Sequence, residues 1–213
     1  MVDLSPPVHM SPILDGDVTV IIPTIRPRIE NGMLDKALAS VNAQTWKPFE
    51  VIVEEDTDHI GSAATRNIAL QRVRTGWVAF LDDDDEMLPE HLDSLYLHAM
   101  DTDADLVYSV PIVPQSPTYV RQQGFWWQPF DEERERIQSY IQSTVLVRTD
   151  ILRKGGGFWC PEGSIYDDWG MVLGVLDAGG KVSHLEKETF IWNHWGFGGP
   201  GRPGNTSGQG SRW

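Results

Sequence analysis

Four consecutive aspartates, residues 82–85, follow directly on the apolar run 78–81. An apolar run of this length predicts a strand buried on both faces of a sheet. Carboxylates packed this closely repel one another unless a cation or water lies among them, and hard divalent cations prefer carboxylate oxygens. The run therefore indicates either a metal site at the end of a strand or an acidic loop that water solvates.

Length and composition narrow the class of protein. The chain has 213 residues, a formal net charge of −14 and one cysteine, Cys160. This length fits one domain with a sizeable core, and the negative charge argues against a nucleic-acid-binding surface. A single cysteine excludes a disulfide framework and a cysteine-ligated zinc site. We see no apolar run of membrane-spanning length and no apolar signal core at the N-terminus, so we expect a cytoplasmic protein without a transmembrane segment.

The first half of the sequence alternates predicted strands with predicted helices. Pro23 is expected to end the first strand and residues 24–28 to form a loop, while Pro89 is expected to open the helix after the aspartates. Alternation of this kind predicts a parallel sheet with right-handed crossovers, in which ligands bind beyond the carboxyl ends of the strands. Acidic residues end two of these strands, so we expect Thr24, Glu54, Glu55 and the aspartates at one edge of the sheet. The predicted strands are 18–22, 50–53, 77–81 and 105–110, and the helices between them are 34–41, 62–74 and 89–99.

The second half is less regular. We predict a strand at 140–147, a helix beginning near Asp168 and two short strands after Gly180. The expected organisation is an N-terminal arm, one domain in two halves, and a glycine-rich flexible tail. These parts are residues 1–16, 17–193 (halves 17–110 and 111–193) and 194–213.

Together these segments resemble the family 2 glycosyltransferases of the GT-A fold. The opening strand 20–24, Thr65-Arg66-Asn67 and the run 80–85 are similar to the family's opening strand, its Ala-Arg-Asn segment and its Asp-x-Asp motif. Gly156-Gly157-Phe158 with 166–169 is similar to its acceptor-side glycine loop and acidic helix start, and His194 to its C-terminal histidine. The resemblance implies an α/β fold with a mostly parallel central sheet flanked by helices and an irregular acceptor-side C-terminal half. It also implies a catalytic domain whose half 17–110 binds the donor and whose half 111–193 binds the acceptor, with the tail as a lid and an inverting mechanism.

The chain departs from the family pattern at three places. Glu54 and Glu55 stand where the family has aspartates that contact the base, Asp167 stands where it more often has glutamate, and the region 111–140 matches no family segment. The first of these departures bears on the preferred nucleotide, for which we expect a UDP-sugar.

Transfer of a sugar from a nucleotide-diphosphate donor requires that the leaving diphosphate be stabilised and that the acceptor hydroxyl lose a proton. A divalent metal, Mn²⁺ or Mg²⁺, meets the first need as a Lewis acid. Asp82 and Asp84 are two residues apart and point to one side of an extended chain, so we expect Asp84 to be the main ligand, with Asp82. His194 is a further candidate ligand from the tail, although a tail histidine is often only solvated.

The second need is met by a base. Asp168 lies at a predicted helix start, which favours an ionised carboxylate near neutral pH. Because aspartate is also a common helix cap, one of Asp167 and Asp168 is expected to cap the helix and the other, Asp168 by the family pattern, to react.

The remaining candidate residues bind donor and acceptor. The acceptor is a hydroxyl on a glycan, a lipid-linked sugar, a protein or a small molecule, and its candidate contacts are Gly157, Trp169 and Trp127, although core packing is the usual role of a tryptophan. The candidate donor-binding residues are Pro23, Thr24, Arg26, Glu54, Glu55, Arg66, Asp82 and Asp83.

Other functions fit the sequence less well. A haloacid-dehalogenase-type phosphatase has its Asp-x-Asp after an early strand, and a dinucleotide-binding oxidoreductase needs a Gly-x-Gly-x-x-Gly loop where this chain has 23–26. Two alternatives stay open: a sugar nucleotidyltransferase-like enzyme, and a non-catalytic module that binds carbohydrate or nucleotide-sugar.

Overall fold

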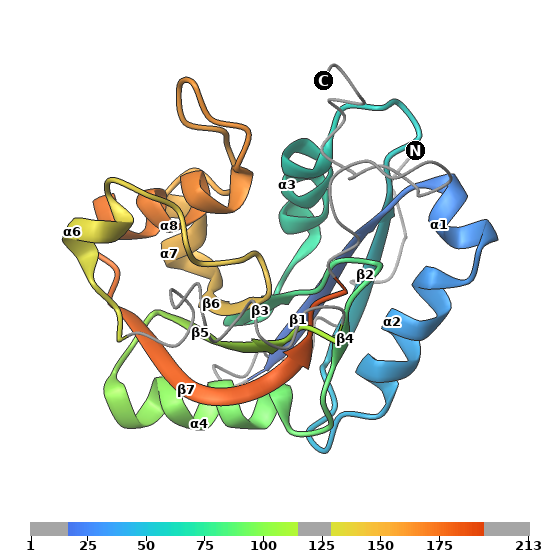
Figure 1. Ribbon diagram of the computed structural model, residues 1–213, viewed down its shortest axis with the longest axis horizontal. Helices are drawn as coiled ribbons and strands as arrows, with labels where there is room; N and C mark the ends of the chain where they lie inside the picture. Colours follow the sequence, from blue (N-terminus) through green and yellow to red (C-terminus); the bar gives the residue numbers. More distant parts are fainter. Residues whose placement is uncertain (1–16, 115–128, 194–213) are drawn as a thin grey trace, which may run out of the picture.

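A single curled sheet runs through the computed structural model, which describes residues 17–114 and 129–193 (Figure 1). The strand order is β2-β1-β3-β6-β5-β7-β4. The strands are β1 Val18–Thr24, β2 Glu50–Glu55, β3 Trp77–Phe80, β4 Glu86–Met87, β5 Leu106–Ile112, β6 Val145–Arg148 and β7 Val182–Ile191.

The sheet is mixed rather than wholly parallel. Strands β2, β1 and β3 are parallel neighbours, as are β5 and β7, but β6 lies between β3 and β5 and is antiparallel to both. The mostly parallel sheet predicted from the sequence is present, with the antiparallel β6 inserted between its third and fourth strands in chain order, β3 and β5. A strand from the second half of the chain fills that place, which sequence order alone does not reveal.

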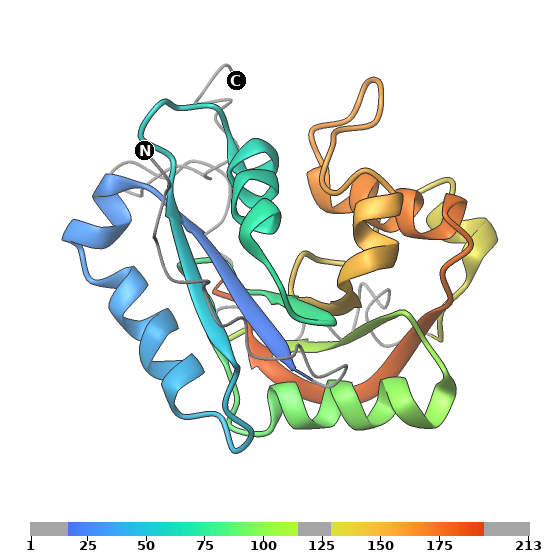
Figure 2. The same cartoon turned by 180° about the vertical axis from the view of Figure 1, so that it is seen from behind.

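Helices cover both faces of the sheet (Figures 1 and 2). Alternation along β3 divides the core, since Val78 and Phe80 pack on the face with α3, α7 and α8, whereas Trp77 and Ala79 pack on the face with α2 and α4. The helices are α1 Arg26–Glu30, α2 Met33–Asn42, α3 Ser62–Arg72, α4 His91–Thr102, α6 Glu132–Glu135, α7 Thr149–Lys154 and α8 Asp167–Asp177. Both faces of the sheet are covered along β1 and β3, which is why these two strands are apolar runs, whereas the edge strand β2 leaves Val53 exposed.

Several predicted boundaries differ in the structure. Pro23 lies inside β1, residues 26–30 form helix α1, and α4 begins at His91 rather than Pro89. The predicted strand 140–147 is confined to β6. Pro23 is tolerated within β1 because a proline nitrogen carries no hydrogen and needs no ladder partner. A second proline, Pro27, lies in the first turn of α1, where an amide would have no helical partner.

The last strand was predicted as two pieces and is one. Strand β7 pairs with β5 through register shifts around Val110, where Leu185 pairs with Ser109 but Glu188 pairs with Val110. The intervening Glu186 and Lys187 are exposed in the bulge, which explains the polar break in the sequence pattern. Among the described residues, no helix has the length and apolar character needed to cross a membrane.

Candidate active site

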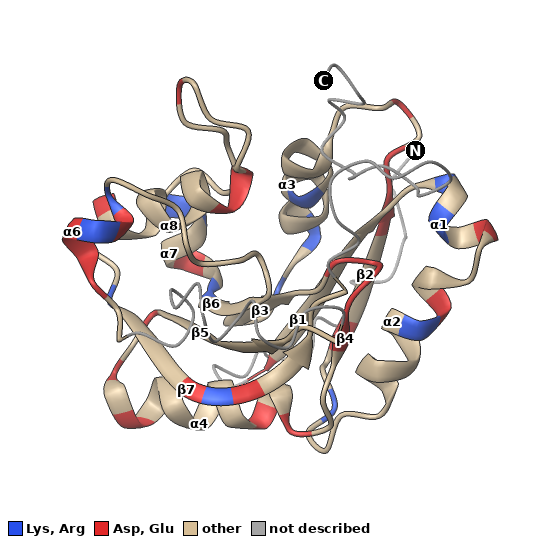
Figure 3. Ribbon diagram, in the orientation of Figure 1, with Lys and Arg blue, Asp and Glu red and all other residues tan. Residues whose placement is uncertain are grey.

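The carboxyl ends of β1, β2 and β3 meet at one edge of the sheet. Thr24 pairs with Glu55, and Ile21 pairs with Phe80, so the aspartates that follow β3 emerge beside the end of β1. They form a tight turn in which the Asp85 amide donates to the Asp82 carbonyl at 3.0 Å. Acidic segments at the end of β2 and in the turn after β3 lie along this edge in Figure 3. The gathering of acidic strand ends at one edge was a prediction from the sequence, and it is confirmed.

The second and third aspartates share a buried arginine. Arg28, from α1, has 4% of its surface exposed, and its Nη1 lies 2.5 Å from Asp83 Oδ1 and 2.8 Å from Asp84 Oδ1. The Thr24 hydroxyl donates to Asp83 Oδ2 at 2.7 Å. Arg28 was absent from the candidates predicted from the sequence. The sequence shows a basic residue in the segment after the first strand, which could have indicated this role. That segment was expected to be a loop, however, and it forms helix α1.

Three of the four aspartates form a group suited to a metal. One carboxylate oxygen from each of Asp82, Asp84 and Asp85 lies within 4.8 Å of the others. Burial raises the pKa of Asp84 to about 6 and that of Asp85 well above its usual value. A hydrogen bond from the Asn193 amide to Asp85 Oδ1, at 2.8 Å, ties the end of the described chain to this group. These oxygens are the donors that Mg²⁺ and Mn²⁺ take.

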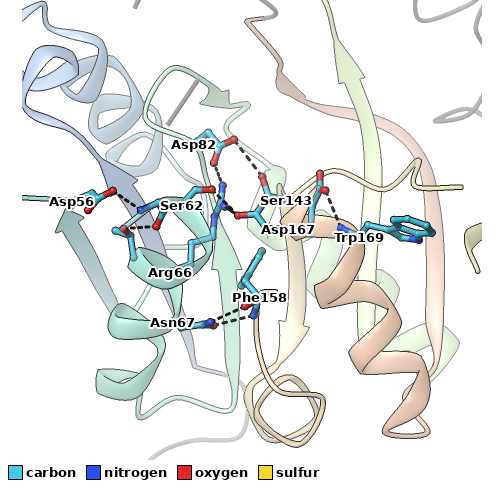
Figure 4. A network of polar contacts seen from close by, with 12 residues as sticks. Asp56, Ser62, Arg66, Asn67, Asp82, Ser143, Phe158, Asp167 and Trp169 are labelled. Carbon is cyan, nitrogen blue, oxygen red and sulfur yellow. Dashed lines mark hydrogen bonds and ion pairs between the residues drawn. The ribbon is translucent and has the colours of Figure 1, made fainter. Parts of the chain in front are cut away.

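Arg66 joins this group to the other half of the site (Figure 4). Its side chain is 3% exposed, and its two terminal nitrogens lie 2.5 Å from Asp82 Oδ1 and 2.8 Å from Asp167 Oδ2. The guanidinium also lies over the ring of Phe158, 5.0 Å from its centroid. Planar guanidinium groups suit such paired and stacked contacts, so one side chain from α3 holds carboxylates of two distant segments in place.

Helix α8 begins at this junction. Asp167 accepts a hydrogen bond of 2.6 Å from the Ser62 hydroxyl, which lies at the start of α3. The Ser62 side chain therefore bonds the acidic start of α8 and does not cap α3. The amides before α3 are instead satisfied by Asp56, whose carboxylate accepts from Ile60 and Gly61 at 2.8 Å each.

Asp168 differs from the expectation in its charge state. A helix N-terminus was expected to keep this carboxylate ionised, but burial and the neighbouring Asp167 raise the pKa of Asp168 to about 7. Arg66 and the Trp169 amide, which donates to Asp168 Oδ1 at 2.8 Å, lower the pKa by less. The cost of removing the group from water outweighs the helix-end effect, so Asp168 titrates near neutral pH.

Two of the predicted acceptor residues have clear packing roles. Gly157 has a φ of +73°, and a Cβ there would lie 2.3 Å from Asn67 Oδ1. Asn67 in turn bonds both the amide and the carbonyl of Phe158, at 2.9 and 2.8 Å. The indole of Trp169 donates to the Glu135 carbonyl at 2.7 Å, which docks α6 on the start of α8.

A buried carboxyl group lies close to Asp168 and was not anticipated. Glu135 is fully buried, and neither carboxyl oxygen makes a well-formed hydrogen bond with another described residue. Burial raises the pKa of Glu135 to about 8; the Tyr140 amide lowers it and Asp168 raises it further. The sequence offered no sign of this, since Glu135 stands in a run of charged residues typical of a solvated helix.

The remaining predicted residues lie at the rim of the site or outside the described chain. Glu55 pairs with Arg26 at 3.0 Å, and Glu54 pairs with Arg72. These pairs place both glutamates at the end of β2, beside Pro23 and Thr24 of β1. Trp127 and His194, like the predicted arm and lid, lie outside the described residues.

Known proteins share both the sequence pattern and the fold. Residues 54–155 match the family described as Glycosyl transferase family 2. Glycosyltransferase GlyA of Streptococcus pneumoniae is 28% identical over 118 residues, and succinoglycan biosynthesis protein ExoW of Rhizobium meliloti is 33% identical over 119 residues. These alignments cover 44% and 43% of this chain but 16% and 37% of the relatives, so this chain spans only a part of their length.

Solved structures share the fold of this chain. S. aureus TarS 1-349 in complex with UDP-GlcNAc has a TM-score of 0.66 at 19% identity, covering 92% of this chain and 61% of that one. The same protein in complex with UDP has a TM-score of 0.61, also at 19% identity, over 83% of this chain and 60% of that one. The likeness shows that the fold is the GT-A arrangement predicted from the sequence. The match over residues 54–155, the two relatives and the shared fold thus make this chain similar to the family 2 glycosyltransferases, as the sequence predicted.

Proposed function

We propose that this chain transfers a sugar from a UDP-sugar to an acceptor hydroxyl, with inversion, using a divalent metal and Asp168 as the base. The observation that carries the proposal is the position of Arg66, whose guanidinium contacts both Asp82 and Asp167. One rigid group thereby holds the strand-end aspartates and the acidic start of α8 on either side of it. A transferase needs this juxtaposition, because donor and acceptor must meet between the two groups.

The donor is proposed to bind at the carboxyl edge of β1 to β3. Ligands of open α/β sheets bind at such edges, and the TarS structures that share this fold were solved with UDP and UDP-GlcNAc. Rim carboxylates accept hydrogen bonds from base or ribose, and arginines offset diphosphate charge. The proposed donor residues are Pro23, Thr24, Arg26, Glu54, Glu55, Arg66, Asp82 and Asp83.

The aspartate group fits the metal that such a donor needs. Asp82 and Asp84 are the proposed ligands from the strand end, and the grouping of oxygens adds Asp85. His194 is proposed as a ligand because it follows Asn193, whose side-chain amide donates to the Asp84 carbonyl at 2.8 Å. When bound, a divalent cation supplies Lewis-acid stabilisation of the charge on the diphosphate.

Asp168 is proposed to take the proton of the acceptor hydroxyl. A carboxylate that titrates near pH 7 is a stronger base than an ordinary aspartate and is still ionised in a large fraction of molecules. Asp167, held by Ser62 and Arg66, fixes the backbone from which Asp168 projects. Direct displacement with one base inverts the anomeric centre.

The acceptor is proposed to approach over the start of α8. Gly157 and Trp169 border this region, and Trp127 is retained as a candidate from the sequence. The hydroxyl it carries belongs to a glycan, a lipid-linked sugar, a protein or a small molecule.

Calorimetric titration of UDP, GDP and dTDP, each with and without Mn²⁺, tests the donor site. Binding of UDP that requires the metal supports the proposal, and binding of none contradicts it. Hydrolysis of UDP-sugars then tests catalysis, with Asp168→Asn as the base variant and Asp177→Asn, at the exposed far end of α8, as its control. An unaltered turnover in Asp168→Asn would remove the base from the proposal, and donor binding without any turnover would favour a non-catalytic module.

A further inference from the structure

Arg28 occupies an unusual place for a cation. Its guanidinium is almost entirely buried and contacts Asp84, one of the three aspartates grouped for a metal. The arginine comes from α1, a five-residue helix directly after β1, so its backbone is anchored independently of the aspartate turn. A positive charge supplied by the protein therefore already stands at the edge where the proposed metal would bind.

The two carboxylates that Arg28 contacts are not equivalent. Asp83 has 1% of its side chain exposed and is also held by the Thr24 hydroxyl, at 2.7 Å. The Asp84 side chain is 16% exposed, and Asp84 belongs to the metal group while Asp83 does not. Asp83 is thus the permanent partner of Arg28, whereas Asp84 is the partner that Arg28 would share with a metal.

Two cations drawn to one carboxylate repel each other at short range, and burial strengthens that repulsion. The other arginine at this turn, Arg66, contacts Asp82 and leaves Asp84 to Arg28. Resting on the metal site of the proposed function, we propose that Arg28 is a built-in counter-ion that competes with a divalent cation for Asp84.

This competition gives the donor a role in metal binding. Without a nucleotide, Arg28 weakens binding of the cation, whereas the negative diphosphate of a donor attracts both Arg28 and the metal. Metal and UDP therefore bind with positive coupling, and a part of that coupling belongs to Arg28. Its removal should strengthen binding of the metal alone more than binding of the metal with UDP.

Titration of Mn²⁺ followed by the electron paramagnetic resonance signal of the free ion tests this without reference to activity. We expect Arg28→Gln to bind Mn²⁺ about tenfold more tightly than the unaltered chain in the absence of nucleotide, and Arg28→Lys, which keeps the charge, to resemble the unaltered chain. Arg72→Gln removes an arginine that pairs with Glu54 instead and should leave the affinity unchanged. Asp84→Asn removes a proposed ligand and should lose Mn²⁺ binding, which shows what loss of the site looks like in this titration.

Arg28→Gln leaves the buried Asp83 without its ion pair, so the double variant Arg28→Gln/Asp83→Asn accompanies it as a neutral pair of similar shape. It too should bind Mn²⁺ more tightly than the unaltered chain. The role of Arg28 is overturned if the folded Arg28→Gln and double variants bind Mn²⁺ no more tightly than the unaltered chain. It is also overturned if Arg28→Lys binds Mn²⁺ as tightly as Arg28→Gln does. Absence of Mn²⁺ binding in every variant, with or without UDP, overturns the proposed metal site itself.

Discussion

The Arg66 guanidinium lies 2.8 Å from the Asp167 carboxylate, and this ion pair ties helix α3 to the start of helix α8. The same side chain reaches Asp82, so the two halves of the site share one buried charge. Loss of Arg66 should lower stability, because carboxylates are left without their cation, and should alter catalysis, because Arg66 lowers the pKa of Asp168.

Arg66→Met should lower the free energy of unfolding by roughly 3 kcal/mol, because it leaves carboxylates of a largely buried cluster without their cation. Urea denaturation measures this change. Arg136→Met, which removes an exposed arginine paired with Asp177, should have a much smaller effect. A similar loss in both variants would show that Arg66 contributes no more than a surface charge.

Activity should depend on pH through Asp168. Because its pKa is raised to about 7, kcat/KM should fall about tenfold per pH unit below that value, as the proton occupies the base. Arg66 lowers the pKa of Asp168, so Arg66→Met should move the acidic limb of the profile to higher pH. A profile that is flat between pH 5 and about 7 would contradict the assignment of Asp168 as the base.

Glu135 should make folding stability depend on pH. Its pKa is about 8 in the folded chain, against an ordinary value of 4.5, so the folded state binds more protons between these values. The contribution of Glu135 to the free energy of unfolding is therefore greatest at low pH. It decreases as the pH rises toward 8, by at most about 1.4 kcal/mol per pH unit. Denaturation of Glu135→Gln across this range should lack that slope, whereas Glu133→Gln, on the exposed face of α6, should retain it.

Gly170 is required by the packing of α8 against the loop before it. A Cβ at this position would lie 1.8 Å from the Trp159 carbonyl oxygen, which is backbone and cannot rotate away. Gly170→Ala should therefore destabilise the chain by roughly 1–3 kcal/mol or more. A Cβ at Gly156 would contact no other atom, so Gly156→Ala is destabilised only by the φ of +89°, which a side chain disfavours. Thermal denaturation should therefore show Gly156→Ala to be the milder variant.

Much of the first half of the chain, which we propose binds the donor, could be predicted from the sequence, because its signals are local. The strands β1, β2 and β3 are apolar runs bounded by prolines, glycines or charges, and parallel strands bring their carboxyl ends to one edge whatever the details of packing. Hence Thr24, Glu55 and Asp82 were expected at that edge and lie there. Helix α1 was missed because five residues with a proline carry too little periodicity to be distinguished from a loop.

The arrangement of the second half of the chain, which we propose binds the acceptor, depends on contacts that no local pattern encodes. The place of β6 between β3 and β5, and the docking of α6 through Trp169, join residues far apart in the chain.

The sequence by itself determined the class of fold, the acidic strand edge and the candidate base, because apolar periodicity and the order of charged residues are local properties. Only the tertiary structure decided the electrostatics: that Arg28 and Arg66 are buried among the aspartates, and that the pKa of Asp168 is raised to about 7 rather than held low by its helix end. Charges and pKa values depend on distance and on exclusion of water, and both are set by which segments fold against each other.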